Sequence, residues 1–131
     1  MDISDWEGTQ NTNNNNRALT GFWIESSLKI SPKQQTEVMA KIFEPDSAYS
    51  EEVLLPLKEV MFTEEIDKNK IYGKTGSGKD NGVWIDAWFV GFIENSSGNT
   101  YFSIYLGQTD DVEISSKAAK EIALRIAEDL Y

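Results

Sequence analysis

The part of the sequence that most constrains the fold runs from residue 70 to residue 107, because strand patterns follow one another there across short polar connections. Residues 70–75 read as a strand, and residues 76–82, which include three glycines, read as a turn. Residues 83–93 form a long pattern rich in aromatic and β-branched side chains, and residues 100–107 form a third strand. Such short connections join only antiparallel neighbours, so the sequence predicts an antiparallel meander of three strands.

The third strand alternates so regularly that it assigns side chains to the two faces of the sheet. The odd positions from Tyr101 to Tyr105 are expected on one face, and the even positions from Phe102 to Leu106 on the other. Residues 95–99 supply the hairpin connection that precedes it.

A helix with clear start signals precedes the strands. Ser31 is a good N-cap, Pro32 fits the first helical position, and Gln34 completes a capping box. Residues 45–47 end this helix. Its apolar face, which is expected to lie on a core, consists of Val38, Met39, Ile42 and Phe43.

Two further helices are predicted from the spacing of apolar residues. One lies within residues 51–62, although Pro56 leaves its start open because an internal proline removes a hydrogen bond. The side chains expected inward are Val53, Leu57, Val60 and Met61. The last helix begins near Ser115 or Ser116, and its expected buried stripe is Ala119, Ile122, Ala123, Ile126 and Leu130.

These elements predict an α+β fold in which helices pack against an antiparallel meander of three strands. The 131 residues suffice for one domain. Residues 1–20 are expected to be an irregular, Asn-rich loop or tail, because the polar run within them cannot pack a core. Residues 21–131 are expected to form a single α+β unit.

The composition excludes several classes of function. The absence of Cys excludes disulfides and thiol nucleophiles, and the absence of His excludes Ser-His-Asp catalysis and most zinc sites. With 12 Lys and Arg against 22 Asp and Glu, the net charge of −10 argues against nucleic acid as a partner. No stretch approaches the ~18 apolar residues of a membrane span, and the first residues do not resemble a targeting signal.

Two short motifs match known chemistry but lack its context. Residues 73–79 fit the start of a phosphate-binding loop, yet Asp80 replaces the hydroxyl residue and a strand, not a helix, is predicted to follow. Ser26 and Lys29 have the spacing of a serine–lysine pair. They precede the helix start at Ser31, where residues three apart do not face each other, so Ser26 is not expected to be a nucleophile.

A third constellation is more specific. Lys74-Thr75-Gly76 ends one strand, AWFVGFIE follows at 87–94 on the next, and FWIESSLKISP stands about fifty residues before the triplet, at 22–32. Together these segments resemble the penicillin-recognising serine enzymes, and within them the class D (oxacillinase-type) β-lactamases and the related β-lactam-sensing receptor domains. The resemblance covers essentially the whole chain, in order, and implies part of the β-lactamase/transpeptidase fold.

The resemblance implies that Lys74, Thr75 and Gly76 line the site and that the backbone N–H of Ser77 supplies half of an oxyanion hole. The physical chemistry of these residue types agrees. A strand edge offers backbone groups to an amide-like ligand, Lys74 adds a fixed cation, and Gly76 allows close approach.

Three more residues have both a functional and a structural interpretation. Trp23 matches the family's tryptophan that steadies the general-base lysine, or is a core aromatic residue. Lys117 is the nearest cation to the position of the family's carboxylate-binding Arg, or is simply solvated. Trp88 contacts substrate, or belongs to the core of the sheet.

The family's nucleophilic Ser and base Lys lie on a helix that has no counterpart here. We therefore expect the C-terminal half of such a protein, inactive alone: a fragment of a class D-like serine β-lactamase, half of a β-lactam sensor, or a non-catalytic oligomeric remnant. No metal or organic cofactor is expected. The expected partners are a β-lactam or peptidoglycan-peptide-like ligand and either a second copy, as a homodimer, or the missing N-terminal half. The family implies an extracytoplasmic location in bacteria, while the chain itself carries no localisation signal.

Overall fold

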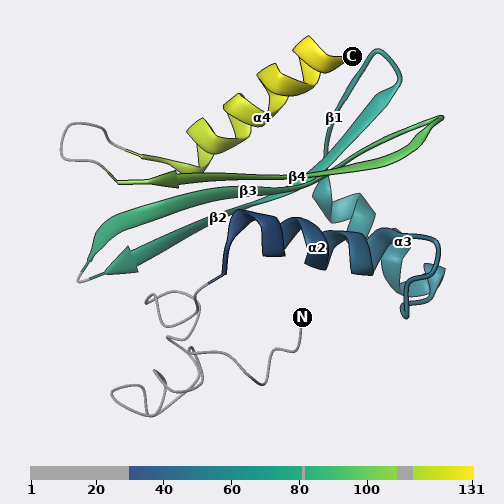
Figure 1. The fold of residues 1–131 in the computed structure, drawn as a ribbon, viewed down its shortest axis with the longest axis horizontal. Coiled ribbons are helices and arrows are strands. Elements are labelled where there is room, and N and C mark those ends of the chain that lie inside the picture. Colours follow the sequence, from purple (N-terminus) through teal and green to yellow (C-terminus); the bar gives the residue numbers. More distant parts are fainter. Residues whose placement is uncertain (1–29, 81, 109–113) are drawn as a thin grey trace.

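The computed structural model describes residues 30–80, 82–108 and 114–131, and in them helices pack on a single antiparallel sheet (Figure 1). The predicted irregular segment, residues 1–20, lies outside the described residues. The elements in chain order are α2 (Pro32–Phe43), α3 (Glu51–Met61), β1 (Phe62–Ile66), β2 (Asn69–Asp80), β3 (Val83–Asn95), β4 (Gly98–Gly107) and α4 (Ser116–Leu130).

The sheet has the order β1-β2-β3-β4, with every neighbouring pair antiparallel. This confirms the predicted meander and adds one strand, β1, which the sequence did not predict. Asp67 and Lys68 both have positive φ, at 48° and 70°, which is the geometry of the tight hairpin turn that joins β1 to β2. Neither residue is a glycine, so the usual sequence signal for this turn is missing.

β2 is also longer than predicted. Residues 76–80, which were expected to form a turn together with 81 and 82, continue the strand and pair with β3 as far as Asp80 opposite Val83. The glycines in this segment suggested a turn, but β3 pairs with β2 from Lys70 to Asp80, with one irregularity between Gly78 and Lys79. Pairing with a neighbouring strand therefore overrides the local preference.

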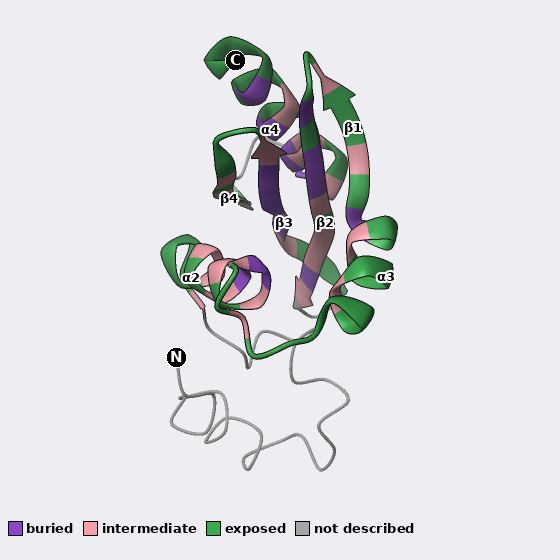
Figure 2. Ribbon diagram, turned by 90° about the vertical axis from the view of Figure 1, so that its right-hand side faces the viewer, coloured by how far each residue is buried: buried purple, intermediate pink, exposed green. Residues whose placement is uncertain are grey.

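The helices cover both faces of the sheet, α4 on one face and α2 with α3 on the other (Figure 1). The alternation predicted for β4 is confirmed. Phe102, Ile104 and Leu106 pack toward α4, whereas Tyr101 packs on the cluster that α2 and α3 share with the sheet. Buried residues are concentrated on the central strands β2 and β3 (Figure 2).

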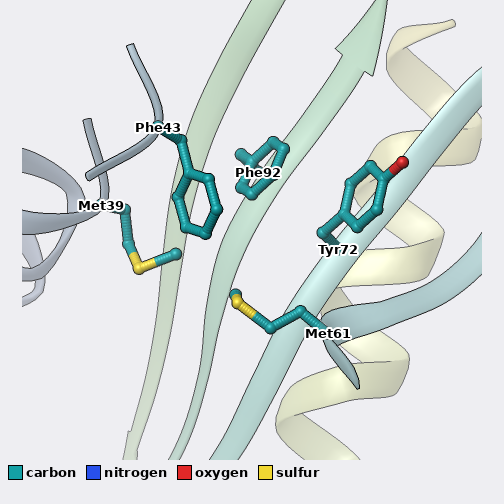
Figure 3. Close-up of a cluster of buried hydrophobic side chains, with 5 residues drawn as sticks. All are labelled: Met39, Phe43, Met61, Tyr72 and Phe92. Atoms are coloured by element: carbon teal, nitrogen blue, oxygen red, sulfur yellow. The ribbon is translucent and has the colours of Figure 1, made fainter. Parts of the chain in front are cut away.

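The core between α2, α3 and the sheet is built around Phe92, which has no exposed surface. Its ring stacks on Tyr72 with centroids 4.8 Å apart and lies 4.5 Å from the ring of Phe43 on α2. Met39 and Met61 complete the cluster (Figure 3). Of the predicted inward residues of α2, Met39 and Phe43 are buried and Ile42 packs against them.

On α4, the expected buried stripe was wrong in part. The helix starts at Ser116, as predicted, and Ser115 is its N-cap. The residues buried against the sheet are Ala119, Ala123 and Ala127, while Ile122, Ile126 and Leu130 are exposed. The small alanine side chains bring the helix close to Phe89 and Phe102, which leaves the larger residues beside the contact.

On α3, the expected inward face was also wrong in part. Met61 is buried and Leu54 packs on the core, but Val53, Leu57 and Val60 are exposed, Val60 to 78%. The helix continues through Pro56 and contacts the sheet only along one side. That contact includes an ion pair between Lys58 and Glu94.

The Lys58–Glu94 ion pair lies beside an aromatic ring of the core. The ammonium group of Lys58 is 4.9 Å from the ring centroid of Tyr72. Burial, and next the charge of Glu94, raise the pKa of Tyr72 above its ordinary value. Tyr72 therefore keeps its proton and can share the carboxylate of Glu94 with Lys58.

The first prediction compares the N-caps of α2 and α3. Ser31 Oγ accepts the N–H of Gln34 at 3.1 Å, and Gln34 Oε1 accepts the N–H of Ser31 at 2.9 Å. Ser50 caps α3 without a side-chain hydrogen bond. We expect Ser31→Ala to lower the free energy of unfolding by about 1 kcal/mol in urea titrations, and Ser50→Ala to change it by much less. Equal losses would contradict this assignment of the caps.

Candidate functional site

The second half of β2 has an open edge. β1 pairs with β2 only as far as Tyr72, so from Gly73 onward β2 is bordered by β3 on one side and by no other strand among the described residues. The backbone groups of the outer side of residues 73–80 thus face away from the sheet. Such an edge can bind an extended or amide-like ligand by main-chain hydrogen bonds.

A groove of about 910 Å³ lies beside this edge, between the sheet and the two helices on the same face. Its floor is formed by side chains and glycines of β2, β3 and β4: Lys74, Gly76, Gly78, Asp86, Trp88, Val90 and Tyr105. Its walls include Gln35, Met39 and Ile42 of α2 and Leu57, Val60 and Met61 of α3. The groove is therefore mainly apolar, with few polar groups, as ligand sites usually are.

The four predicted site residues of β2 all line this groove. Lys74 points onto its floor, where the ammonium group donates to the backbone carbonyl of Thr75 at 2.8 Å. The side chains of Thr75 and Ser77 point to the other face of the sheet, because successive residues of a strand alternate between the faces. These two residues therefore border the groove with their backbone atoms at the strand edge. The structure thus places Lys74, Thr75, Gly76 and Ser77 together at the open edge.

Gly76 and Gly73 have different reasons to be glycine. A Cβ atom added at Gly76 would find its nearest neighbour at 3.6 Å, on Trp88, which is an ordinary contact. A Cβ atom at Gly73 would lie 2.2 Å from the ring of Phe89. Gly73 is therefore required by packing, whereas Gly76 leaves free space on the floor of the groove.

The position of Trp88 combines features of both interpretations given above, a substrate contact and a residue of the sheet core. It is half-buried, faces the groove from β3, and its ring packs on Tyr105 with centroids 4.6 Å apart. Tyr105 and Asp86 were not predicted as site residues. Asp86 shares the parity of Trp88 on β3, and Tyr105 pairs with Trp88, so the register of the sheet is what would have identified both residues.

Lys117 does not line the groove. Lys117 lies in the first turn of α4, on the opposite face of the sheet, exposed and 3.8 Å from Glu121. Trp23, like Ser26 and Lys29, lies outside the described residues. The phosphate-loop pattern at 73–79 lies within β2 and is followed by the strand β3, so the predicted lack of a helix there is confirmed.

The described residues bring together no cluster of three or more carboxylate side chains that could hold a metal ion. None of the helices in this part of the chain is both long and apolar enough to cross a membrane. The charged side chains that line the groove are Lys74 and Asp86.

Comparison with known proteins identifies what this arrangement is similar to. Residues 4–128 match the model of the penicillin-binding protein transpeptidase domain. The chain is 35% identical to beta-lactamase OXA-1 of Escherichia coli over 130 residues, which are 96% of this chain and 46% of that enzyme.

Solved structures give the same result for the fold. The chain superposes on a class D beta-lactamase from Bacillus subtilis with a TM-score of 0.69 and 29% identity, over 94% of this chain and 51% of that one. It superposes on the C-terminal domain of the BlaR penicillin receptor of Bacillus licheniformis with a TM-score of 0.69 and 27% identity, over 82% and 43%. The match is to the C-terminal half of these domains, and the chain spans less than half the length of the Escherichia coli enzyme.

The two glycines give the second prediction. We expect Gly73→Ala to lower the free energy of unfolding by more than 2 kcal/mol, because Phe89 cannot move out of a packed core, and Gly76→Ala to change it by less than about 0.5 kcal/mol. Urea unfolding of both variants measures this. The assignment fails if Gly76→Ala is the more destabilising of the two.

Proposed function

We propose, from the premise that this chain belongs to the family of penicillin-binding protein transpeptidase domains, that it forms the Lys-Thr-Gly side of a β-lactam-binding site. The class D enzymes and the BlaR receptor among its relatives support a β-lactam-related role. Our finer proposal is a class D-like serine β-lactamase, in which the β-lactam acylates a serine and the acyl group is then hydrolysed. The observation that carries the proposal is the open edge of β2 beside the groove.

The edge suits a β-lactam because the ligand carries amide groups and a carboxylate. The backbone of residues 75–77 can pair with the amide groups in the manner of an added strand. The free space over Gly76 lets the ligand approach the backbone, and the ammonium group of Lys74 can bind the carboxylate. Trp88 and Tyr105 supply an apolar floor.

The acylation step assigns a role to the N–H of Ser77. A serine Oγ attacks the lactam carbonyl, its proton goes to a base and then to the leaving nitrogen, and the C–N bond of the ring opens. Negative charge develops on the carbonyl oxygen in the tetrahedral intermediate. A backbone N–H fixed at the strand edge stabilises this charge, which is usually the largest contribution to catalysis of acyl transfer. We assign the attacking serine and its base to the half of the domain that the matched relatives possess outside the region of similarity.

The third prediction tests this assignment on the chain itself. We expect weak, non-covalent binding of benzylpenicillin, with shifts of the amide NMR signals of residues 74–77 and no hydrolysis of a chromogenic cephalosporin. Lys74→Ala should weaken binding about tenfold, because a charged hydrogen bond to the carboxylate is lost.

Lys79→Ala is the matched control, because the ammonium group of Lys79 lies 4.0 Å above the ring of Trp84 and Lys79 does not line the groove. Binding that is unaffected by Lys74→Ala would contradict the proposed site. Hydrolysis by the pure chain would contradict the placement of the serine in the other half.

A β-lactam sensor is the second candidate, supported by the similarity to the BlaR penicillin receptor, whose TM-score equals that of the Bacillus subtilis enzyme. Both candidates use the same strand edge and the same acylation. They differ in the lifetime of the acyl group, because a sensor keeps it and an enzyme hydrolyses it. Mass spectrometry of a whole domain containing this half, after exposure to penicillin, separates the two: a persistent adduct favours the sensor and rapid loss favours the enzyme.

We further propose that the isolated, ligand-free chain forms a homodimer through the groove face, and that a β-lactam competes with the second copy for this face. The open edge of β2 and the exposed apolar side chains of α3 both lie there, and such surfaces associate. When the other half of the domain is present, it would cover the same face. The net charge of −10 opposes pairing of two copies, so salt should promote the dimer.

The fourth prediction concerns this dimer. Sedimentation equilibrium at micromolar concentration should show a dimer that Val60→Asp weakens, because Val60 is exposed on the groove wall. Val83→Asp is the control, since Val83 is exposed at the end of the sheet and does not line the groove. A monomer at both low and high salt would contradict the proposal.

A further inference from the structure

The groove has an electrostatic polarity along the open edge of β2. Of the described residues that line it, two are charged, and they are placed at different points along the strands: Lys74 opposite Val90, and Asp86 opposite Gly78. Four residues of strand separate the two positions, which is about 13 Å of backbone. A ligand that extends along the edge therefore meets a cation toward one end and an anion toward the other.

The carboxylate of Asp86 lies over β2, because the residue opposite it on that strand is a glycine. Gly78 is its cross-strand partner, and a Cβ atom added at Gly78 would lie 2.6 Å from Asp86 Oδ1. The carboxylate thus lies over the backbone of β2, next to the segment where the ligand would pair. A larger residue at position 78 would exclude it from this place.

Asp86 has no ion-pair or hydrogen-bond partner among the described side chains. The nearest lysine in sequence, Lys79, points its ammonium group at the ring of Trp84. Lys74, which is four residues from Gly78 along β2, donates to the backbone carbonyl of Thr75. A half-buried carboxylate beside an apolar floor is unfavourable without a partner, so this position favours a ligand that brings positive charge.

The floor between the two charges is aromatic. Trp88 stands opposite Gly76, midway between the positions of Lys74 and Gly78, and Tyr105 packs against it. Because Gly76 and Gly78 have no side chains, the ring and the carboxylate are both accessible from the strand edge. The groove thus combines a cation, an aromatic surface and an anion in that order.

We propose that Asp86 is a specificity-determining residue that makes the groove prefer β-lactams with a cationic side chain over neutral or anionic ones. The inference rests on the proposed function, since it takes the ligand carboxylate to bind at Lys74. An ammonium group near the far end of the ligand then pairs with Asp86, and an anionic group at the same point is repelled.

The test uses two ligands that differ by one ammonium group, ampicillin and benzylpenicillin, and the purified 131-residue chain. We expect ampicillin to bind about fivefold more tightly, as measured by NMR titration at low salt, and the difference to shrink as salt screens the pair. Asp86→Asn should abolish the preference by weakening ampicillin alone, and Asp86→Glu should retain it.

Asp46→Asn is the control for net charge, because Asp46 is exposed in the connection between α2 and α3 and does not line the groove. A preference that survives Asp86→Asn, or equal affinities in the unchanged chain, would overturn the role of Asp86 while leaving the proposed function intact. If neither penicillin shifts the signals of residues 74–77, the proposed function is refuted and this inference with it.

Discussion

The pairing of β2 with β3 is the interaction on which the rest of the structure depends. The register of this long antiparallel ladder fixes which side chains of both strands face α4 and which face α2 and α3. Tyr72 and Phe92 form a pair at one end and build the core, while Gly78 and Asp86 form a pair at the other end and belong to the groove. A shift of one residue would exchange the two faces, so core and site depend on the same register.

The same ladder also explains why the site is open. β1 is short and ends its pairing at Tyr72, while β3 continues along β2 to Asp80. Residues 73–80 are thus held in extended conformation from one side only. This gives a preorganised edge, because the strand does not need to be ordered when a ligand pairs with it.

Local signals in the sequence predicted those parts of the fold that depend on nearby residues. The capping box at Ser31 and the start of the last helix near Ser115 or Ser116 were predicted because such signals are contained within about four residues. The predictions from sequence were wrong where a residue distant in the chain determines the structure. Pairing with β3 extends β2 through two glycines. The alanines of α4, rather than its isoleucines, face the sheet because Phe89 and Phe102 fill the space between.

The candidate site shows the same division. Lys74, Thr75 and Gly76 were predicted because they form a short triplet that, together with the segments at 22–32 and 87–94, resembles a known family, whereas Asp86 and Tyr105 join them only through cross-strand pairing.

Ligand selection and turnover are separable in this arrangement. In the proposed function, the strand edge, Lys74 and Asp86 would act on the ligand before and during acylation, and they would act alike in an enzyme and in a sensor. The lifetime of the acyl group depends on how a water molecule is activated, which requires a base at the ester carbonyl. Asp86 stands opposite Gly78, whereas the proposed oxyanion donor is the N–H of Ser77 at the strand edge. A change at Asp86 should therefore alter which β-lactam is accepted and leave the fate of the acyl group unchanged.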